Sequence, residues 1–405
     1  MNSYLKNKPL IYFLIYLTFI ASYIFGENSS GGSYNDFVAM QMYVEQISKN
    51  FRQGIILFFE EGQGHSPIFY IIKSILENFF NKIGSDLILL TLGFSIPLVF
   101  YTILQKQFRR CDKNLLFLIS LVLYLSPYIR SSAVWATNDN LGILFVALSI
   151  SKFLTCKHIQ KDNFKNIFLC FFYLIIAAYI RQYYIIIILA YIFFLYRNIS
   201  IKSFFYLAFF SLILSIPALI YTYYFILTNF DYATSGFTSP DLIFNLLTFF
   251  SMYLFYILPF FFQLKNLKVI KDRFNDNKFC FILITIIFIM IYFFYDQPNM
   301  PFGGGINYKI YQLLDSKVFF ILISLVGIFL ILLTVNLNYN NLLMLILLFF
   351  MFPFSIIYQK YYDPIMIIIF FSLIQSDLIY EKIKFKKINM YLVFTYFFIF
   401  LIGSN

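Results

Sequence analysis

Charged side chains are scarce in this sequence, and their scarcity excludes a water-soluble domain. Only 12% of the 405 residues are charged, whereas 61% are hydrophobic. Soluble globular domains usually carry about 25% charged residues. The longest inner loop that we expect, 265–278, is too short to fold alone. We therefore predict a protein that lies almost entirely in a membrane and has no soluble domain.

Cysteine and glycine are also rare. The four cysteines fall in predicted spans or inner loops, and their spacing matches no metal-binding pattern; they are Cys111, Cys156, Cys170 and Cys280. The sequence thus predicts neither a structural disulfide nor a cysteine-ligated metal. It contains no Walker-type glycine loop, so any energy that the protein uses is expected to come from its substrate or from a gradient.

Long apolar runs recur from Pro9 to Ile402. Because about 20 apolar residues make one helical span, we predict an all-α polytopic membrane protein with about thirteen spans. The first span, 9–25, is expected to remain as an anchor, because its apolar core is long for a signal peptide and Ala21-Ser22-Tyr23 is a poor cleavage site. The other expected spans are 86–105, 114–129, 140–155, 166–180, 182–196, 203–227, 243–264, 279–295, 318–335, 340–358, 364–379 and 388–403.

The segment 65–83 admits two interpretations. Lys73, Glu77 and Lys82 recur among its apolar residues at helical spacing, which is typical of an amphipathic helix lying on a membrane surface. If this segment crossed the membrane instead, every later loop would change sides. We predict a surface helix, which makes 26–85 one outer segment.

Basic residues select the orientation of the chain. Lysine and arginine are retained on the cytosolic side of membranes, and most of the 30 in this chain then fall inside while most of the 19 acidic residues fall outside. The net charge of +11 thus reports membrane orientation, not nucleic-acid binding. We expect the N-terminus inside and the C-terminus outside. Two transmembrane modules are expected, 1–228 and 229–405, the second with outer loops 228–242 and 296–317.

The polar residues of the first outer segment are candidates for function. Asp36 lies where a loop meets a predicted helix, so its carboxylate could act as a general base or could cap that helix. His65 is the only histidine on the outer side and precedes Ser66-Pro67. It could bind a phosphate or a sugar hydroxyl, or cap the helix that follows. Glu60 and Glu61 lie just before it.

Two further outer segments carry charges at the ends of spans. Arg130 follows Ser126-Pro127, and Asp139 opens the next span, either as a helix cap or as a site residue. Arg181 interrupts the apolar stretch 167–195 between two short predicted helices. An ionisable residue among apolar spans is a functional candidate, and a guanidinium suits a phosphate. The alternative is that Arg181 extends to the lipid headgroups.

The later outer loops add two lysines. Lys309 follows Gly303-Gly304-Gly305, which we interpret as a flexible lid, because no helix is expected to follow this run in the way that a phosphate-binding loop requires. Lys360 lies in a tyrosine-rich turn that ends at Pro364, and it could also meet a phosphate.

The order of these features over most of the chain resembles the GT-C superfamily of polytopic glycosyltransferases. The layout is most similar to the protein O-mannosyltransferase and lipid A aminoarabinose transferase branches. Tyr34-Asn35-Asp36 matches the first-loop acid of the family, although Phe37 stands where the family often has glutamate. His65-Ser66-Pro67 matches a His-Pro-Pro-type segment that lacks its middle proline.

Three later motifs carry the rest of the resemblance. Thr137-Asn138-Asp139 matches the second acid of the family, and Ile180-Arg181-Gln182 matches the element that contacts the donor phosphate. The turn Lys360-Tyr361-Tyr362-Asp363-Pro364 is loosely similar to a late basic turn.

The resemblance implies a glycosyltransferase whose donor is a sugar on polyprenyl or dolichyl phosphate and whose acceptor is a lipid, glycan or protein. It makes Asp36 the catalytic base, and Arg181, Lys360 and His65 the ligands of the donor phosphate. Asp139 would be a second acid, and a divalent metal, if the enzyme uses one, would be held by Asp36 and Asp139. We expect a bacterial inner membrane with the active site on the outer side. A membrane polysaccharide polymerase and a lipid-linked sugar flippase are the alternatives.

Overall fold

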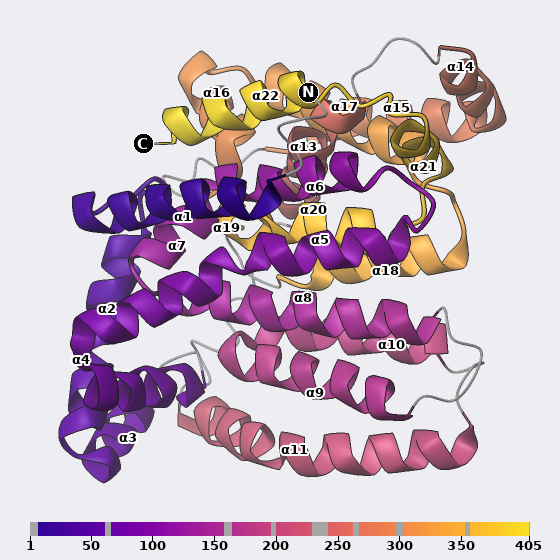
Figure 1. Cartoon of the computed structure of the whole chain (residues 1–405). Helices are drawn as coiled ribbons and strands as arrows, with labels where there is room; N and C mark the ends of the chain where they lie inside the picture. The colour runs from indigo at the N-terminus through magenta and orange to yellow at the C-terminus, as the bar shows by residue number, and fades with distance from the viewer. Residues whose placement is uncertain are drawn as a thin grey trace. The chain divides into compact units, whose positions relative to one another are not determined.

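The computed structural model describes residues 7–60, 66–157, 164–195, 200–228, 242–261, 267–296, 303–352 and 357–404 (Figure 1). All regular secondary structure in these ranges is helical. The predicted all-α class is therefore confirmed for the described part of the chain.

Six helices in the described ranges are long and apolar enough to cross a bilayer, and the number rises to eight if two bent helix pairs each count as one span. Shorter apolar helices of 10–17 residues accompany them. Helices of this length and composition indicate a membrane-embedded protein. The total of about thirteen spans and the orientation stay predictions.

One predicted span, 114–129, is broken in the structure. The helices α6 (Lys113–Leu121) and η2 (Val122–Leu125) end before Ser126, and α7 (Pro127–Val134) continues at an angle of 61°. The Ser126 hydroxyl accepts a hydrogen bond from the Ile129 N–H at 3.0 Å, and Pro127 occupies the first turn, where its missing N–H costs nothing. The expected outer loop after Ser126 is therefore a helix.

A second predicted span, 364–379, is also divided. The helices α19 (Gln359–Tyr362) and α20 (Ile365–Ser372) precede α21 (Asp377–Lys384), and the two sides of the break meet at 83°. The Ser376 hydroxyl accepts the Ile379 N–H at 3.2 Å and so caps α21. A continuous apolar span at 364–379 was thus the wrong expectation.

The chain forms two compact units. The first comprises 1–109, 113–233 and 397–405, and the second comprises 110–112 and 234–396. The boundary predicted from the sequence lies at 228/229.

Helices of the first unit pack side by side around α8 (Asn138–Lys157) (Figure 1). Its neighbours include α5 (Ile96–Gln107) and α9 (Phe164–Ile180), and α9 in turn contacts α11 (Ile201–Thr228). The unit also contains α1 (Lys8–Phe25), α2 (Ser33–Lys49), α3 (Phe51–Glu60), α4 (Ile68–Phe94), η3 (Gln182–Ile186) and α10 (Ile187–Leu195).

The helix α4 includes most of the predicted surface helix, 65–83, and the beginning of the predicted span 86–105. It bends at Asn81, whose φ of 58° and ψ of 177° are not helical. Lys73 Nζ lies 3.1 Å from Asp86 Oδ1 across this bend, and both side chains are buried. Lys73 was expected on the polar face of a surface helix, but its charge is instead paired within the protein.

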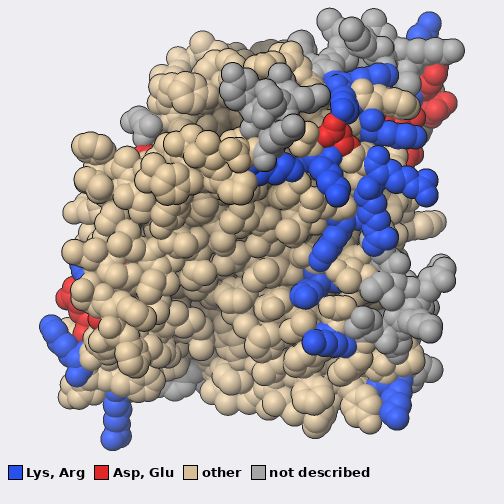
Figure 2. Space-filling model, in the orientation of Figure 1, with Lys and Arg blue, Asp and Glu red and all other residues tan. Residues whose placement is uncertain are grey.

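Lys106, Lys165 and Lys202 lie toward the ends of the first unit's helices away from Asp139. The Lys106 ammonium donates to the carbonyl and the hydroxyl of Ser151, each at 2.8 Å. Ser151 follows Asp139 on α8 by about 18 Å of helix. Lys165 opens α9, whose other end meets Asp139, and Lys202 opens the adjacent α11. Figure 2 shows a surface that is mostly uncharged, on which lysine and arginine side chains gather in groups.

The second unit is built around the contact of α13 (Leu242–Phe261) with α17 (Lys317–Thr334). Its core contains Phe244, Tyr308 and Phe320. This unit also contains α19, α20 and α21, together with α14 (Leu267–Asp276), α15 (Lys278–Phe294), α16 (Gly305–Leu314), α18 (Tyr339–Phe350) and α22 (Met390–Gly403). The last residues of α22 belong to the first unit.

Candidate functional site

The helix α4 gathers the candidate residues of the first unit. It contacts α2, α7, α8 and α9. Tyr70 lies near its start and is buried, and its phenol is within electrostatic range of Asp36, Asp139 and Arg181. Three residues that the sequence singled out in separate segments thus act electrostatically on one side chain.

Asp139 and Arg181 form an ion pair. Arg181 Nη2 lies 2.6 Å from Asp139 Oδ1, and the two side chains are 8% and 20% exposed. Asp139 is in the first turn of α8, where the helix dipole favours a carboxylate. Arg181 lies between α9 and η3 with an extended backbone, φ −140° and ψ 102°. The break between two short helices therefore turns its side chain to α8.

Gly142 allows this end of α9 to approach α8 closely. A Cβ atom at Gly142 would lie 3.0 Å from Tyr184 and 3.5 Å from the Arg181 side chain. Such a contact with Tyr184 is tighter than ordinary van der Waals packing, so a larger residue would displace the ring. The absence of a side chain at Gly142 thus helps to bring Arg181 to Asp139.

Asp36 lies in the first turn of α2 and is partly buried. The helix is capped by Gly32, and the Asp36 N–H already bonds the Gly32 carbonyl at 3.0 Å. Asp36 is therefore not the helix cap, which was the structural alternative to a functional role. The ammonium groups of Lys73 and Lys82 make cation–π contacts with the neighbouring Phe37 ring, at 4.6 and 5.1 Å from its centroid.

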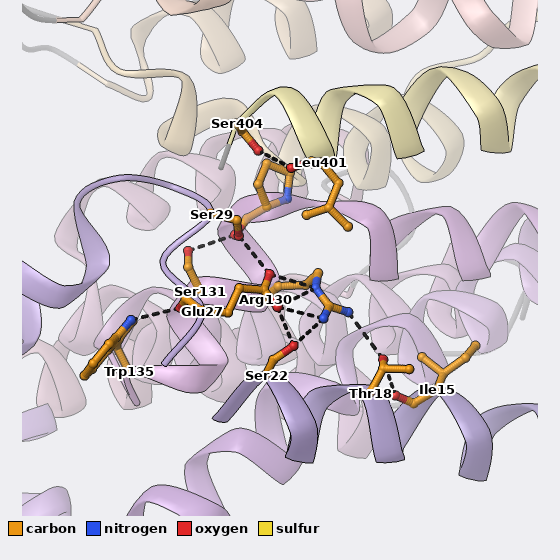
Figure 3. A network of polar contacts seen from close by, with 11 residues as sticks. Ile15, Thr18, Ser22, Glu27, Ser29, Arg130, Ser131, Trp135, Leu401 and Ser404 are labelled. Atoms are coloured by element: carbon orange, nitrogen blue, oxygen red, sulfur yellow. Dashed lines mark hydrogen bonds and ion pairs between the residues drawn. The ribbon is translucent and has the colours of Figure 1, made fainter. Parts of the chain in front are cut away.

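Arg130 has a partner that the sequence did not indicate (Figure 3). It binds both oxygens of Glu27, with Nε 2.9 Å from Oε1 and Nη2 2.8 Å from Oε2. Burial alone would raise the pKa of Glu27, but hydrogen bonds from Arg130, Ser22 and Ser29 and the charge of Arg130 outweigh it. The pKa of Glu27 is therefore lowered below its usual value.

The remaining candidates are Glu60, Glu61, His65, Lys309 and Lys360. Glu60 is exposed at the end of α3, and Glu61 and His65 lie outside the described residues. Lys309 is exposed on α16, and Lys360 lies 5.9 Å from the centroid of the Tyr358 ring; both lysines belong to the second unit.

The glycine run 303–305 leads directly into a helix, α16 (Gly305–Leu314). The first turn of this helix is already occupied, because the Gln359 side-chain oxygen accepts the Ile306 N–H at 2.8 Å. The Gly304 N–H donates to the Ile357 carbonyl at 2.8 Å. The start of α16 and the segment 357–359 therefore bind each other, and this arrangement is not a phosphate cradle.

A divalent metal does not fit Asp139 in this arrangement. One of its oxygens lies 2.6 Å from the Arg181 guanidinium, so a cation already occupies the position that a metal would take. Among the residues that the structure describes, no three His, Cys, Asp or Glu side chains are grouped to hold a metal ion. We derive no step that uses a metal.

Sequence reasoning missed Tyr70, Glu27 and the Lys73–Asp86 pair. Tyr70 is one of 34 tyrosines and has no distinguishing neighbours in the sequence. Glu27 follows a span directly, where an acid is ordinary. Lys73 was noted only as part of an amphipathic segment and Asp86 was not singled out, and the bend at Asn81 brings the two together.

No protein-family model, curated protein or solved structure matches the chain. The function is therefore argued from the grouped residues alone.

Proposed function

We propose that the chain is a membrane glycosyltransferase that moves a sugar from a polyprenyl- or dolichyl-phosphate donor to a lipid, glycan or protein acceptor. The observation that carries the proposal is the Asp139–Arg181 ion pair, together with Asp36 in electrostatic range of the same Tyr70 phenol. The Asp36 carboxylate and the Arg181 guanidinium are the two kinds of group that such a transfer needs, a proton acceptor and a phosphate ligand.

In the proposed reaction Asp36 accepts the proton of the acceptor hydroxyl. The hydroxyl oxygen attacks the anomeric carbon with inversion, the bond from that carbon to the phosphate oxygen breaks, and the lipid phosphate leaves. Arg181 stabilises the charge that develops on the phosphate, a contact typically worth about 3 kcal/mol. Because Asp139 already holds Arg181, the donor phosphate would have to share or displace that carboxylate.

The proposal includes the topology derived from the sequence: about thirteen spans, the N-terminus inside and the C-terminus outside. The grouped acids then lie on the outer face of the membrane, and Lys106, Lys165 and Lys202 on the inner face. A bacterial inner membrane is the proposed location. In the first unit, Lys106 bonds Ser151, which lies far from Asp139 along α8. This separation supports a membrane protein whose two faces carry opposite charges.

A lipid-linked sugar flippase is the second candidate, and the buried Lys73–Asp86 pair favours it. Both side chains are nearly inaccessible, at 1% and 8% exposure, within a largely apolar helix. Paired charges at such positions often lie on the path of a transported group.

The test is transfer of radiolabelled sugar from undecaprenyl-phosphate and dolichyl-phosphate donors by purified protein. Asp36→Asn should lose roughly 100-fold or more of the wild-type rate, because it removes the base. Glu45→Gln is the matched control, since Glu45 is an exposed acid on the same helix. Equal rates for Asp36→Asn and wild type would exclude Asp36 as the base. Translocation of labelled donor across proteoliposomes without any transfer, abolished by Lys73→Met, would establish the flippase instead.

A further inference from the structure

The short helix α7 lies between the loop that leads to Asp36 and the helix that carries Asp139. The loop 26–32 joins α1 to α2, and α7 is followed after four residues by Asp139. Asp139 is therefore connected to α7 by a short stretch of chain, whereas the loop that leads to Asp36 is held to α7 by contacts between side chains and backbone. The relative position of the two carboxylates depends on how each stretch is fastened to α7.

Three neutral hydrogen bonds fasten the loop 26–32 and the start of α2 to α7 and the adjoining Trp135, and Figure 3 shows those of Trp135 and Ser29. The Trp135 indole donates to the Glu27 carbonyl, the Ser29 hydroxyl donates to the Pro127 carbonyl, and the Ser33 hydroxyl donates to that of Ser131, each at 3.0 Å. The Trp135 ring also contacts those of Tyr34 and Phe37, at centroid distances of 4.7 and 5.5 Å.

A second set of contacts fastens Asp139 to the same helix. The Thr137 N–H donates to the Ser132 carbonyl at 3.0 Å, and the hydroxyls of these two residues lie 2.5 Å apart. The Asn140 amide donates to the Ile129 carbonyl at 2.8 Å. Asp139 thus lies between two residues that are tied to α7.

The Glu27–Arg130 pair is the charged part of the first fastening. Arg130 donates hydrogen bonds to both carboxylate oxygens of Glu27. This two-point contact fixes the orientation of the two side chains as well as their separation. Its guanidinium also lies 4.8 Å from the centroid of the Phe19 ring, so it is held on α1 from a second side. The side chains of Arg130 and Glu27 are only 11% and 14% exposed, so solvent screens their attraction weakly.

We propose that Arg130 is a positioning residue: by holding Glu27 it fixes the loop 26–32 on α7 and so sets Asp36 against Asp139 and Arg181. The catalytic consequence rests on the proposed function, in which Asp36 is the base. The position of Asp36 relative to Arg181 does not depend on the proposed function, and it is measured separately.

The position of Asp36 is measured by spin labels at Asn35→Cys and Ile185→Cys, with the four native cysteines replaced. Asn35 precedes Asp36, Ile185 lies in η3 four residues after Arg181, and both are exposed. Pulsed electron paramagnetic resonance should give one narrow distribution of distances between the two labels when Arg130 is present. Arg130→Gln should broaden it at least twofold, and Arg130→Lys, which keeps the charge but loses the two-point contact, should give an intermediate width.

Two further variants separate positioning from a general loss of structure. Glu27→Arg combined with Arg130→Glu reverses the pair and should restore the narrow distribution. Arg52→Gln removes an exposed arginine of α3 and should leave the distribution unchanged. If Arg130→Gln gives the wild-type distribution, or if the reversed pair stays as broad as Arg130→Gln while its helix content is native, the proposal is wrong.

Two further measurements distinguish positioning of Asp36 from a general effect on stability: the separate changes in kcat and donor KM, and the pH dependence of the distance distribution. Arg130→Gln should lower kcat by roughly 10- to 100-fold with less than about a twofold change in donor KM, because a small misplacement of the base affects the chemical step. Glu27 holds Arg130 only when ionised. Because its pKa is lowered in the folded protein, the narrow distribution should persist as the pH falls through the usual glutamate range and broaden only below it.

The two proposals fail in different ways. If the distribution broadens in Arg130→Gln but no variant, wild type included, transfers sugar, the positioning role stands and glycosyl transfer falls. If kcat falls while the distribution and its pH response match those of the wild type, Arg130 does not act by positioning and the inference is overturned.

Discussion

Arg181 and Asp139 show how a charge can be kept among apolar helices. Moving a guanidinium and a carboxylate out of water costs several kcal/mol for each ion, and only close geometry with further polar contacts offsets that cost. At 2.6 Å, with exposures of 8% and 20%, the pair meets the first condition. Removing one partner would take away the counter-charge that lies 2.6 Å from the other.

We therefore predict that Arg181→Gln and Asp139→Asn each lower the free energy of unfolding by about 3 kcal/mol. The double variant should lose clearly less than the sum, because it leaves no uncompensated charge. Denaturation of the purified protein in mixed detergent micelles measures this, with Arg52→Gln as the exposed control. Strictly additive losses would show that the two side chains do not depend on each other.

The sequence indicates these two residues but not their contact. Arg181 interrupts an apolar run and Asp139 opens another, and each interruption is visible without a structure. Glu27 is not visible in this way, because its importance comes from Arg130, which lies 103 residues away in the sequence. A residue can be selected from its local context, whereas its partner depends on how the helices pack.

At the scale of elements, α13 and α17 approach each other closely at one glycine. A Cβ atom at Gly327 would lie 2.0 Å from the Phe250 carbonyl oxygen, which belongs to the backbone and cannot rotate away. Small residues at such crossings allow helices in membranes to pack with their backbones in contact. This contact joins the two helices that form the centre of the second unit.

Gly327→Ala should therefore separate α13 from α17 and destabilise the second unit by about 3 kcal/mol, the upper end of the usual cost of overpacking. Thermal unfolding in detergent, followed by helix content, measures the loss. Val326→Ala on the exposed side of α17 is the control and should change the midpoint little. A Gly327→Ala protein as stable as the control would mean that the two helices are not in close contact at this point.

Helix existence follows from the apolar runs, but helix continuity does not. The breaks at 126 and at 373–376 fall inside stretches that are apolar enough for one span. Hydropathy reports how favourably a stretch leaves water, whereas a bend depends on local hydrogen bonds such as that from the Ile129 N–H to Ser126. Ser126-Pro127 was a readable helix-start signal, and the apolar pattern around it dominated the prediction.

At the scale of the whole molecule, charge decides which way the chain crosses the membrane. Retention of lysine and arginine on the cytosolic side predicts that Lys113 lies inside and that Asn35 lies outside. The structure adds that α4 bends at Asn81, so its two halves can differ in their relation to the membrane. If only the second half crosses, one span separates Asn35 from Lys113; if both halves cross, the two residues lie on the same side.

Labelling of single-cysteine variants with a membrane-impermeant maleimide in intact cells decides between these arrangements. We expect Asn35→Cys, Ile185→Cys and Asp315→Cys to react from outside, and Lys113→Cys and Lys384→Cys to react only after the membrane is permeabilised; all five positions are exposed. Reaction of Lys113→Cys in intact cells, together with Asn35→Cys, would make both halves of α4 spans. Protection of both Lys113→Cys and Ile185→Cys with Asn35→Cys labelled would show that the bent pair of α6 and α7 enters and leaves on one side. That outcome would put Arg181 on the opposite face from Asp36 and end the case for a shared site.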